Sequence, residues 1–178
     1  MNSGIKIQIA CPDDARGMQE VYYRTWLATY PNEQVGVTID DIESKYADRF
    51  SDEKLLKRRG QLANPAPGHT FLVAKDGDAV VGLCYFIKTA EQNQLQAIYI
   101  LPEYQGQGAG KLFWHEAEKY LDFSRDIIVS VATYNTSAIS FYNKLGFVDT
   151  GLRREDEKFK MKSGVIIPEM EMVLKPHS

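Results

Sequence analysis

Residues 98–111 read Ile98-Tyr99-Ile100-Leu101-Pro102-Glu103-Tyr104-Gln105-Gly106-Gln107-Gly108-Ala109-Gly110-Lys111. This order predicts a strand, a glycine-rich turn and then a helix. Three glycines at alternate positions let the backbone bend so that several N–H groups point at one spot. The first N–H groups of the following helix also carry partial positive charge. The stretch therefore predicts a site for an anion such as a diphosphate.

Two other glycine-rich motifs fit these residues poorly. A Walker loop needs a glycine where Gln105 stands and a hydroxyl residue where Leu112 stands. A dinucleotide-binding fingerprint needs a glycine in place of Lys111. A turn that merely starts a helix is the remaining alternative, although it explains one glycine more readily than three.

A second motif lies farther along the chain and reads Asn135-Thr136-Ser137-Ala138-Ile139-Ser140-Phe141-Tyr142-Asn143-Lys144-Leu145-Gly146-Phe147. Asn135 is a favoured N-cap residue, and Gly146 is typical of the position just after a helix. The motif therefore predicts a short helix over 136–145. Ala138, Tyr142 and Leu145 share one face of that helix, so a core aromatic is an alternative role for Tyr142.

Composition limits the remaining function classes. The 178 residues are 44% hydrophobic and 25% charged, which predicts one globular domain over 1–178. The net charge of −3 lacks the basic excess of nucleic-acid binders, so we expect no nucleic-acid partner. Two cysteines and three scattered histidines form no disulfide framework and no metal motif. Without a signal peptide or a membrane-length apolar run, we expect a cytoplasmic protein with no membrane partner.

Apolar spacing predicts the order of the secondary-structure elements. Strands are expected at 5–9, 70–75, 79–88, 94–101, 126–132, 147–152 and 165–174, and helices at 13–30, 39–62, 108–123 and 136–145. The charged run Arg153–Lys158 is expected to be a solvated loop. Strands that come first as a group and then alternate with helices predict an α/β (α+β) fold with a mixed sheet.

Together, the Gln-x-x-Gly-x-Gly motif at Gln105–Gly110 and the Asn-x-x-Ala-x-x-x-Tyr-x-x-x-Gly-Phe motif at Asn135–Phe147 resemble the GCN5-related N-acetyltransferase (GNAT) superfamily. The resemblance implies a mainly antiparallel sheet of about seven strands, flanked by about four helices and splayed between the fourth and fifth strands. It implies acetyl-CoA as the cofactor. The residues implied to bind the cofactor are Ile98, Tyr99, Ile100, Gln105, Gly106, Gln107, Gly108, Ala109, Gly110, Lys111, Asn135 and Tyr142.

The implied reaction is transfer of the acetyl group to a primary amine of a small amine, a polyamine or a peptide. Thiols and tyrosines have ordinary pKa values of about 8.5 and 10, so the Tyr142 hydroxyl can donate a proton to the departing thiolate as general acid. A backbone N–H near Tyr99 or Ile100 would stabilise the developing oxyanion. Many relatives carry a glutamate where this chain has Asn93 to Gln96, which leaves the base unassigned among Glu91, Glu169 and a chain of waters.

Members of the superfamily usually bind the acceptor between the first helices and the last strands, which points to Trp26, Tyr30 and Glu33. The run Trp26–Pro31 resembles the PaiA-like polyamine acetyltransferases, and aromatic rings would attract a cationic amine. Trp26 and Tyr30 have packing of the first helix as their alternative role. A non-catalytic CoA-binding regulatory protein is the alternative function. We expect a monomer or a homodimer.

Overall fold

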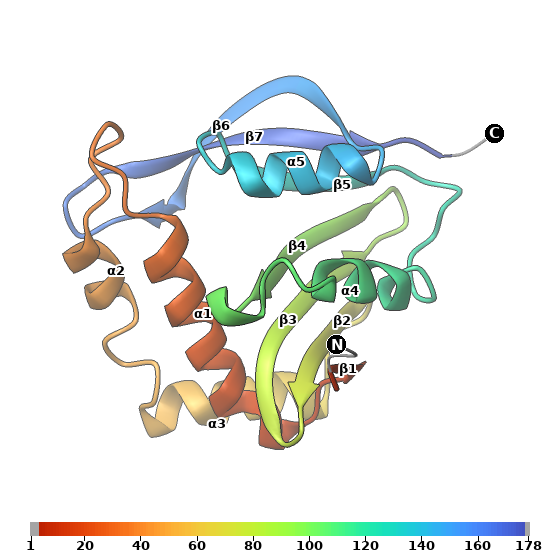
Figure 1. Ribbon diagram of the computed structural model, residues 1–178, viewed down its shortest axis with the longest axis horizontal. Helices are drawn as coiled ribbons and strands as arrows, with labels where there is room; N and C mark the ends of the chain where they lie inside the picture. Colours follow the sequence, from red (N-terminus) through yellow and green to blue (C-terminus); the bar gives the residue numbers. More distant parts are fainter. Residues whose placement is uncertain (1–3, 177–178) are drawn as a thin grey trace.

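The computed structural model describes residues 4–176, which form one seven-stranded sheet with helices packed against it (Figure 1). The strand order is β1-β2-β3-β4-β5-β7-β6, and only the β4–β5 pair is parallel. The strands are β1 (Lys6–Ile9), β2 (His69–Asp76), β3 (Ala79–Lys88), β4 (Asn93–Ile100), β5 (Ile127–Ala132), β6 (Val148–Lys160) and β7 (Ile166–Leu174). The α-helices are α1 (Ala15–Thr29), α2 (Ile39–Lys45), α3 (Asp52–Ala63), α4 (Ala109–Ala117) and α5 (Thr136–Lys144). The predicted fold class is confirmed, with five α-helices in the described residues instead of four.

The helix predicted over 39–62 is wrong as one element, because it is divided into α2 and α3. Thr38 and Asp41 form a capping box at the start of α2, and the Ser51 hydroxyl accepts a hydrogen bond from the Lys54 amide at the start of α3. Each cap begins a separate helix. The sparse apolar face of this segment did not show where the first helix ends.

The charged run Arg153–Lys158 is also not a loop, because it lies within the long strand β6. The backbone of β6 pairs with β7 at Arg153↔Met170 and Arg154↔Glu169. Side chains on this edge strand are mostly exposed, and Arg153 pairs with Asp149 at 2.7 Å. An exposed edge strand tolerates a charge on nearly every residue, so the sequence resembled a loop.

The sheet splits between β4 and β5, as predicted. These strands pair only from Asn93↔Ile127 to Leu95↔Val129. On its other side, β4 has a bulge at the next residue, because β3 pairs with Ala97 and then with Leu95 and skips Gln96. A bulge bends its strand, so β4 turns away from β5 immediately after their last paired residues.

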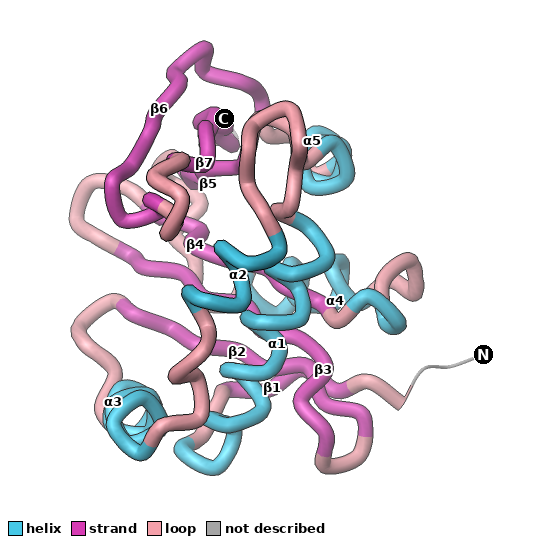
Figure 2. Tube along the Cα trace, turned by 90° about the vertical axis from the view of Figure 1, so that its left-hand side faces the viewer, coloured by secondary structure: helices cyan, strands magenta, loops and turns pink. Residues whose placement is uncertain are grey.

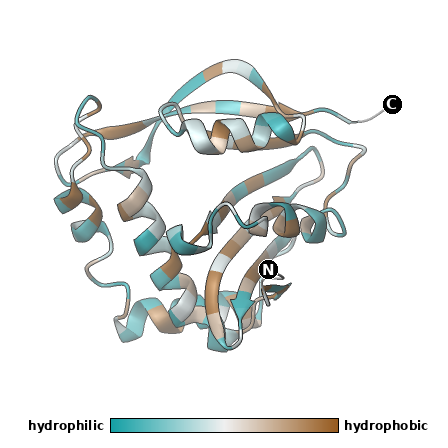
Figure 3. Cartoon of the chain, viewed as in Figure 1, coloured by the Kyte–Doolittle hydropathy of each residue, from teal (hydrophilic) through white to brown (hydrophobic). Residues whose placement is uncertain are grey.

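The helices bury the central strands. Met18 of α1, Leu83 and Phe86 of β3 and Phe113 of α4 are fully buried, and Figure 3 shows hydrophobic segments along the central strands. In the turned view, α1, α2 and α3 lie on the side that faces the reader (Figure 2). No helix of residues 4–176 combines the length and apolar character needed to cross a membrane.

Candidate active site

The turn before α4 bares a row of backbone amides. Gly106 and Gly108 adopt φ angles of +73° and +88°, a region that favours glycine. Gly108 precedes α4, and its carbonyl accepts hydrogen bonds from the amides of Lys111 and Leu112. Within residues 4–176, the N–H groups of 106–110 donate no hydrogen bond. Two of the three glycines expected to bend the turn do so, and the turn leaves its donors open.

Gly110 has a different reason to be glycine. Its φ is not positive, but a Cβ atom here would lie 3.0 Å from the Phe141 ring of α5. The missing side chain lets α4 and α5 approach closely. Gly110 therefore sets the distance between the two helices that flank the split in the sheet.

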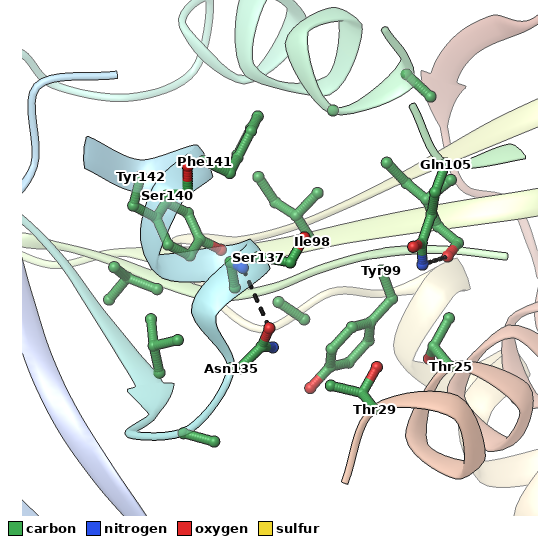
Figure 4. A pocket seen from close by; sticks show the side chains of 18 of the residues that line it. Thr25, Thr29, Ile98, Tyr99, Gln105, Asn135, Ser137, Ser140, Phe141 and Tyr142 are labelled. Carbon is green, nitrogen blue, oxygen red and sulfur yellow. Dashed lines mark hydrogen bonds between the residues drawn. The ribbon is translucent and has the colours of Figure 1, made fainter. Parts of the chain in front are cut away.

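Two glutamine side chains brace the same turn. The Gln105 side-chain amide donates a hydrogen bond of 2.8 Å to the carbonyl of Ile100, at the end of β4 (Figure 4). The Gln107 side-chain amide donates one of 2.8 Å to the carbonyl of Glu103. These bonds tie the turn to the strand and to the residues before it.

A cavity of about 620 Å³ lies in the split between β4 and β5. Its walls are the outer part of β4, the end of β5, the turn before α4, one face of α5 and the end of α1. The predicted cofactor-binding residues that line it are Ile98, Tyr99, Ile100, Gln105, Gly106, Gly108, Ala109, Gly110, Lys111, Asn135 and Tyr142. Gln107 does not line it, because its exposed side chain turns back to Glu103.

Tyr142 lies in α5 and is 5% exposed. Its ring packs against Phe141 and Phe147 at centroid distances of 5.3 and 5.4 Å. Its hydroxyl points into the cavity (Figure 4) and makes no hydrogen bond within the described part of the chain. Burial raises the pKa of Tyr142 well above that of an exposed tyrosine. The ring of Tyr142 thus belongs to the core, while its protonated hydroxyl faces the cavity.

Asn135 positions the helix that carries Tyr142. Its side-chain oxygen accepts a hydrogen bond of 3.1 Å from the Ala138 amide, as an N-cap does. At the other end, Gly146 follows the helix with a φ of +95°. Both predicted ends of this helix are confirmed, and together they fix the place of Tyr142 in the cavity wall.

Tyrosines gather at the end of the cavity near α1. The hydroxyls of Tyr30 and Tyr99 lie 3.2 Å apart, and the Tyr134 hydroxyl donates to the Tyr30 carbonyl at 2.9 Å. Tyr30 and Tyr99 line the cavity. Burial raises the pKa of Tyr134 to about 12 and that of Tyr99 well above its ordinary value. All of these hydroxyls are protonated near neutral pH and can donate or accept hydrogen bonds.

The other two predicted acceptor residues do not line the cavity. Trp26 is 5% exposed and packs against Tyr30 with 4.4 Å between the centroids of the tilted rings. The Trp26 indole N–H is buried and has no hydrogen-bond partner among residues 4–176. Glu33 is exposed in the turn closed by the Asn32↔Val37 bridge. Trp26 supports the Tyr30 wall from behind, whereas Glu33 lies outside it.

The carboxylates considered as bases lie in different places. Glu91 is exposed in the turn between β3 and β4 and is not part of the cavity wall. Glu169 is a partly buried residue of β7, opposite Ala132 of β5. Burial raises the pKa of Glu169, although the charges of Lys158 and Arg154 oppose that change. Glu169 does not line the cavity either, but its strand partner Ala132 does, so Glu169 lies nearer the cavity wall than Glu91 does.

Sequence reasoning missed several polar residues in the wall. They are Thr25 and Thr29 of α1, Ser130 of β5, and Ser137, Ser140 and Lys144 of α5. Ser137, Ser140 and Lys144 recur at intervals of three and four, so they share one face of α5. This polar face of α5 was the feature of the sequence that could have predicted these cavity-lining residues.

Comparisons with known proteins agree with this geometry. A family model described as an acetyltransferase (GNAT) domain matches residues 26–163. Spermidine N(1)-acetyltransferase of Thermoplasma acidophilum is 30% identical over 149 residues, covering 80% of this chain and 88% of that protein. Peptidyl-lysine N-acetyltransferase YjaB of Salmonella typhimurium is 32% identical over 87 residues, covering 49% of this chain and 55% of that protein.

The fold has a similar solved counterpart. The crystal structure of the PaiA N-acetyltransferase from Thermoplasma acidophilum in complex with coenzyme A superposes with a TM-score of 0.70 at 24% identity. The superposition covers 97% of this chain and 99% of that one. On the family match and the shared architecture, the chain belongs to the acetyltransferase (GNAT) domain family.

Proposed function

We propose that this protein transfers the acetyl group of acetyl-CoA to a primary amine of a small amine, a polyamine or a peptide. The observation that carries the proposal is the row of open amides at 106–110, which faces the cavity in the split sheet. We further propose that residues 1–178 form one such domain, acting in the cytoplasm as a monomer or homodimer. Neither nucleic acid nor membrane is part of the proposal.

The residues present fit this cofactor. Within residues 105–111, the open amides of 106–110 suit a pyrophosphate, because free N–H groups at a helix start bind anions. Beyond Leu95, β4 has no strand partner on the side of β5, so the edge at Ile98–Ile100 is free for the pantetheine amides. Asn135 and Tyr142 flank that edge from α5. Bound acetyl-CoA would supply the acetyl thioester, and residues of the protein would bind it, orient it and transfer protons.

Proton transfer is assigned to two residues. The Tyr142 hydroxyl faces the cavity without a hydrogen-bond partner in the described chain, and burial keeps it protonated, so it serves as the general acid toward the leaving sulfur. Glu169 is proposed to take the proton from the attacking amine, through water, since its raised pKa brings it closer to neutrality. The N–H of Tyr99 or Ile100 is proposed to stabilise the oxyanion.

The acceptor is proposed to enter at the tyrosine end of the cavity, beside Tyr30. Tyr30 and Tyr99 line this end of the cavity with aromatic rings and hydroxyls, which suit a cationic amine. Trp26 acts by holding Tyr30, and Glu33 would contact only the outer part of a long acceptor. The likeness to a spermidine acetyltransferase supports a polyamine of the PaiA-like subgroup as the first acceptor to test.

The test follows free thiol while acetyl-CoA is mixed with a panel of polyamines, simple amines and lysine peptides. Thiol release that depends on the amine supports the proposal. Tyr142→Phe should lower kcat by about 10²-fold, a typical contribution of a general acid. The matched control is Tyr120→Phe, because Tyr120 lies outside the cavity. Thiol release that is absent with every amine, while coenzyme A still binds, would favour the non-catalytic regulator instead.

A further inference from the structure

A second cavity, of about 310 Å³, lies between α1, the α2–α3 connection and α3. It shares no lining residue with the cavity in the split sheet. Most of α3 is hydrophilic, as Figure 3 shows. Five basic side chains line this second cavity: Lys45, Arg49, Lys54, Lys57 and Arg58.

Nearby carboxylates balance only part of this charge. Arg49 pairs with Glu20 at 3.5 Å, and Lys54 pairs with Asp48 at 3.6 Å. Lys45, Lys57 and Arg58 form no ion pair with any carboxylate in residues 4–176. Like charges held close together in a cavity repel one another, and this repulsion destabilises the folded state.

Arg58 gives the sharpest sign that a ligand belongs here. Its guanidinium carbon lies 5.3 Å from the centre of the Tyr22 ring and 5.9 Å from that of Phe71. Its Nε atom is buried and has no hydrogen-bond partner within residues 4–176. A buried donor without a partner is costly, and a charged one is more so. Aromatic rings hold the guanidinium in place, while no carboxylate of residues 4–176 pairs with it.

Lys45 shows the same imbalance at the opposite wall. Burial lowers the pKa of Lys45, and the charge of Lys54 lowers it further. Its Nζ atom lies 5.2 Å from the centre of the Trp26 ring. An anion placed between Lys45 and Arg58 would relieve the repulsion on both.

We propose that this second cavity binds the diphosphate group of a small anion. Arginine forks and lysine ammonium groups are the side chains that recognise phosphate oxygens, and cations on several walls suit more than one phosphate. The volume lies at the lower end of the range for small-molecule sites, which fits a diphosphate with little attached to it. Free pyrophosphate and a nucleoside diphosphate share this chemistry.

Calorimetry with sodium pyrophosphate and with ADP tests the proposal. The titrations use protein saturated with coenzyme A, so that the turn at 105–111 cannot contribute. If coenzyme A does not bind, the proposed function fails. The same titrations are therefore repeated on cofactor-free protein, where they still test the second cavity. Saturable heat is expected from at least one of the two anions. The anion that binds more tightly shows whether the cavity prefers free pyrophosphate or a nucleoside diphosphate.

The double variant Lys45→Gln/Lys57→Gln should weaken that binding about tenfold or more, since charge-assisted bonds are lost. Lys45 and Lys57 are exposed residues, so the fold should tolerate both changes, and the urea unfolding midpoint checks that it does. Lys6→Gln/Lys119→Gln, two exposed lysines elsewhere, removes the same net charge and should leave the affinity unchanged. Absence of saturable heat from both anions, or equal weakening in the two double variants, overturns the proposal.

Discussion

The side chain of Asn93 hydrogen-bonds both backbone polar groups of Asp122. Its Nδ2 donates to the Asp122 carbonyl at 2.8 Å, and its Oδ1 accepts from the Asp122 amide at 3.0 Å. Asn93 starts β4 and is fully buried, and Asp122 lies shortly before β5. This clamp fixes the two strands where they pair, whereas the bulge at Gln96 separates them a few residues later. The split in the sheet is therefore anchored at one end and open at the other.

Asn93→Ala should lower the free energy of unfolding by about 2 kcal/mol, because it leaves partly buried backbone groups of Asp122 without partners. Urea unfolding measures the change. Gln94→Ala is the matched control, since its side-chain partner Gln96 is exposed. Equal midpoints for the two variants would show that the clamp does not hold the strands.

Gly108→Ala should weaken coenzyme A binding about tenfold, because its φ of +88° strains any other residue by about 1–2 kcal/mol. No atom lies within 4 Å of the added Cβ, so strain and not collision is tested. Gly164→Ala, with a φ of +91° in the β6–β7 connection and equally open space, is the control. Gly164→Ala should lose stability but keep its affinity for coenzyme A. An unchanged affinity in Gly108→Ala would show that the turn does not bind the cofactor.

Asp41 should give the protein an acid-sensitive contact. Burial alone would raise the pKa of Asp41, but hydrogen bonds from Thr38 and Ser163 hold it at about 2, below its ordinary 3.8. A lowered pKa stabilises the folded state above pH 3.8, and that stabilisation disappears as the pH falls toward 2.

Asp41→Asn should therefore lose about 1–2 kcal/mol at pH 7 and progressively less between pH 4 and 2. Urea unfolding at several pH values measures the difference between wild type and variant. Asp40→Asn, which removes an exposed carboxylate beside Lys162, should change little at any pH. A difference that stays constant from pH 7 to 2 would disprove this role for the ionised Asp41.

Tyr142 should remain protonated in alkaline solution, because burial raises its pKa. Folded wild type and Tyr142→Phe should therefore show the same rise in tyrosinate absorbance up to about pH 11. In urea, where every tyrosine is exposed, the wild type should gain one tyrosinate more than the variant. A deficit of one titrating tyrosine in the folded variant would show that the Tyr142 hydroxyl is not shielded.

Local signals in the sequence predicted the parts of the site with their own backbone requirements. Gly106, Gly108, Asn135 and Gly146 occupy turns or caps that few other residues can form, so their positions revealed the geometry. Gly110 belonged to the same motif for another reason, its contact with Phe141, which only the packed structure shows.

Features that depend on partners far along the chain were harder to predict. Ser163 meets Asp41 across 122 positions, so the start of α2 is held partly by a hairpin that the local pattern does not show. The pairing of Arg153 with Met170 likewise turns a charged run into a strand. Asn93 resembled a replacement for a catalytic carboxylate, yet its side chain clamps the backbone at Asp122.

Amide chemical shifts measured by NMR during a titration report directly whether the open amides at 106–110 bind the pyrophosphate of coenzyme A. Coenzyme A should move the signals of residues 106–110 strongly. Pantetheine, which lacks the pyrophosphate, should instead move mainly the signals of β4. Saturation by coenzyme A with the signals of 106–110 unmoved would show that these amides do not bind the pyrophosphate.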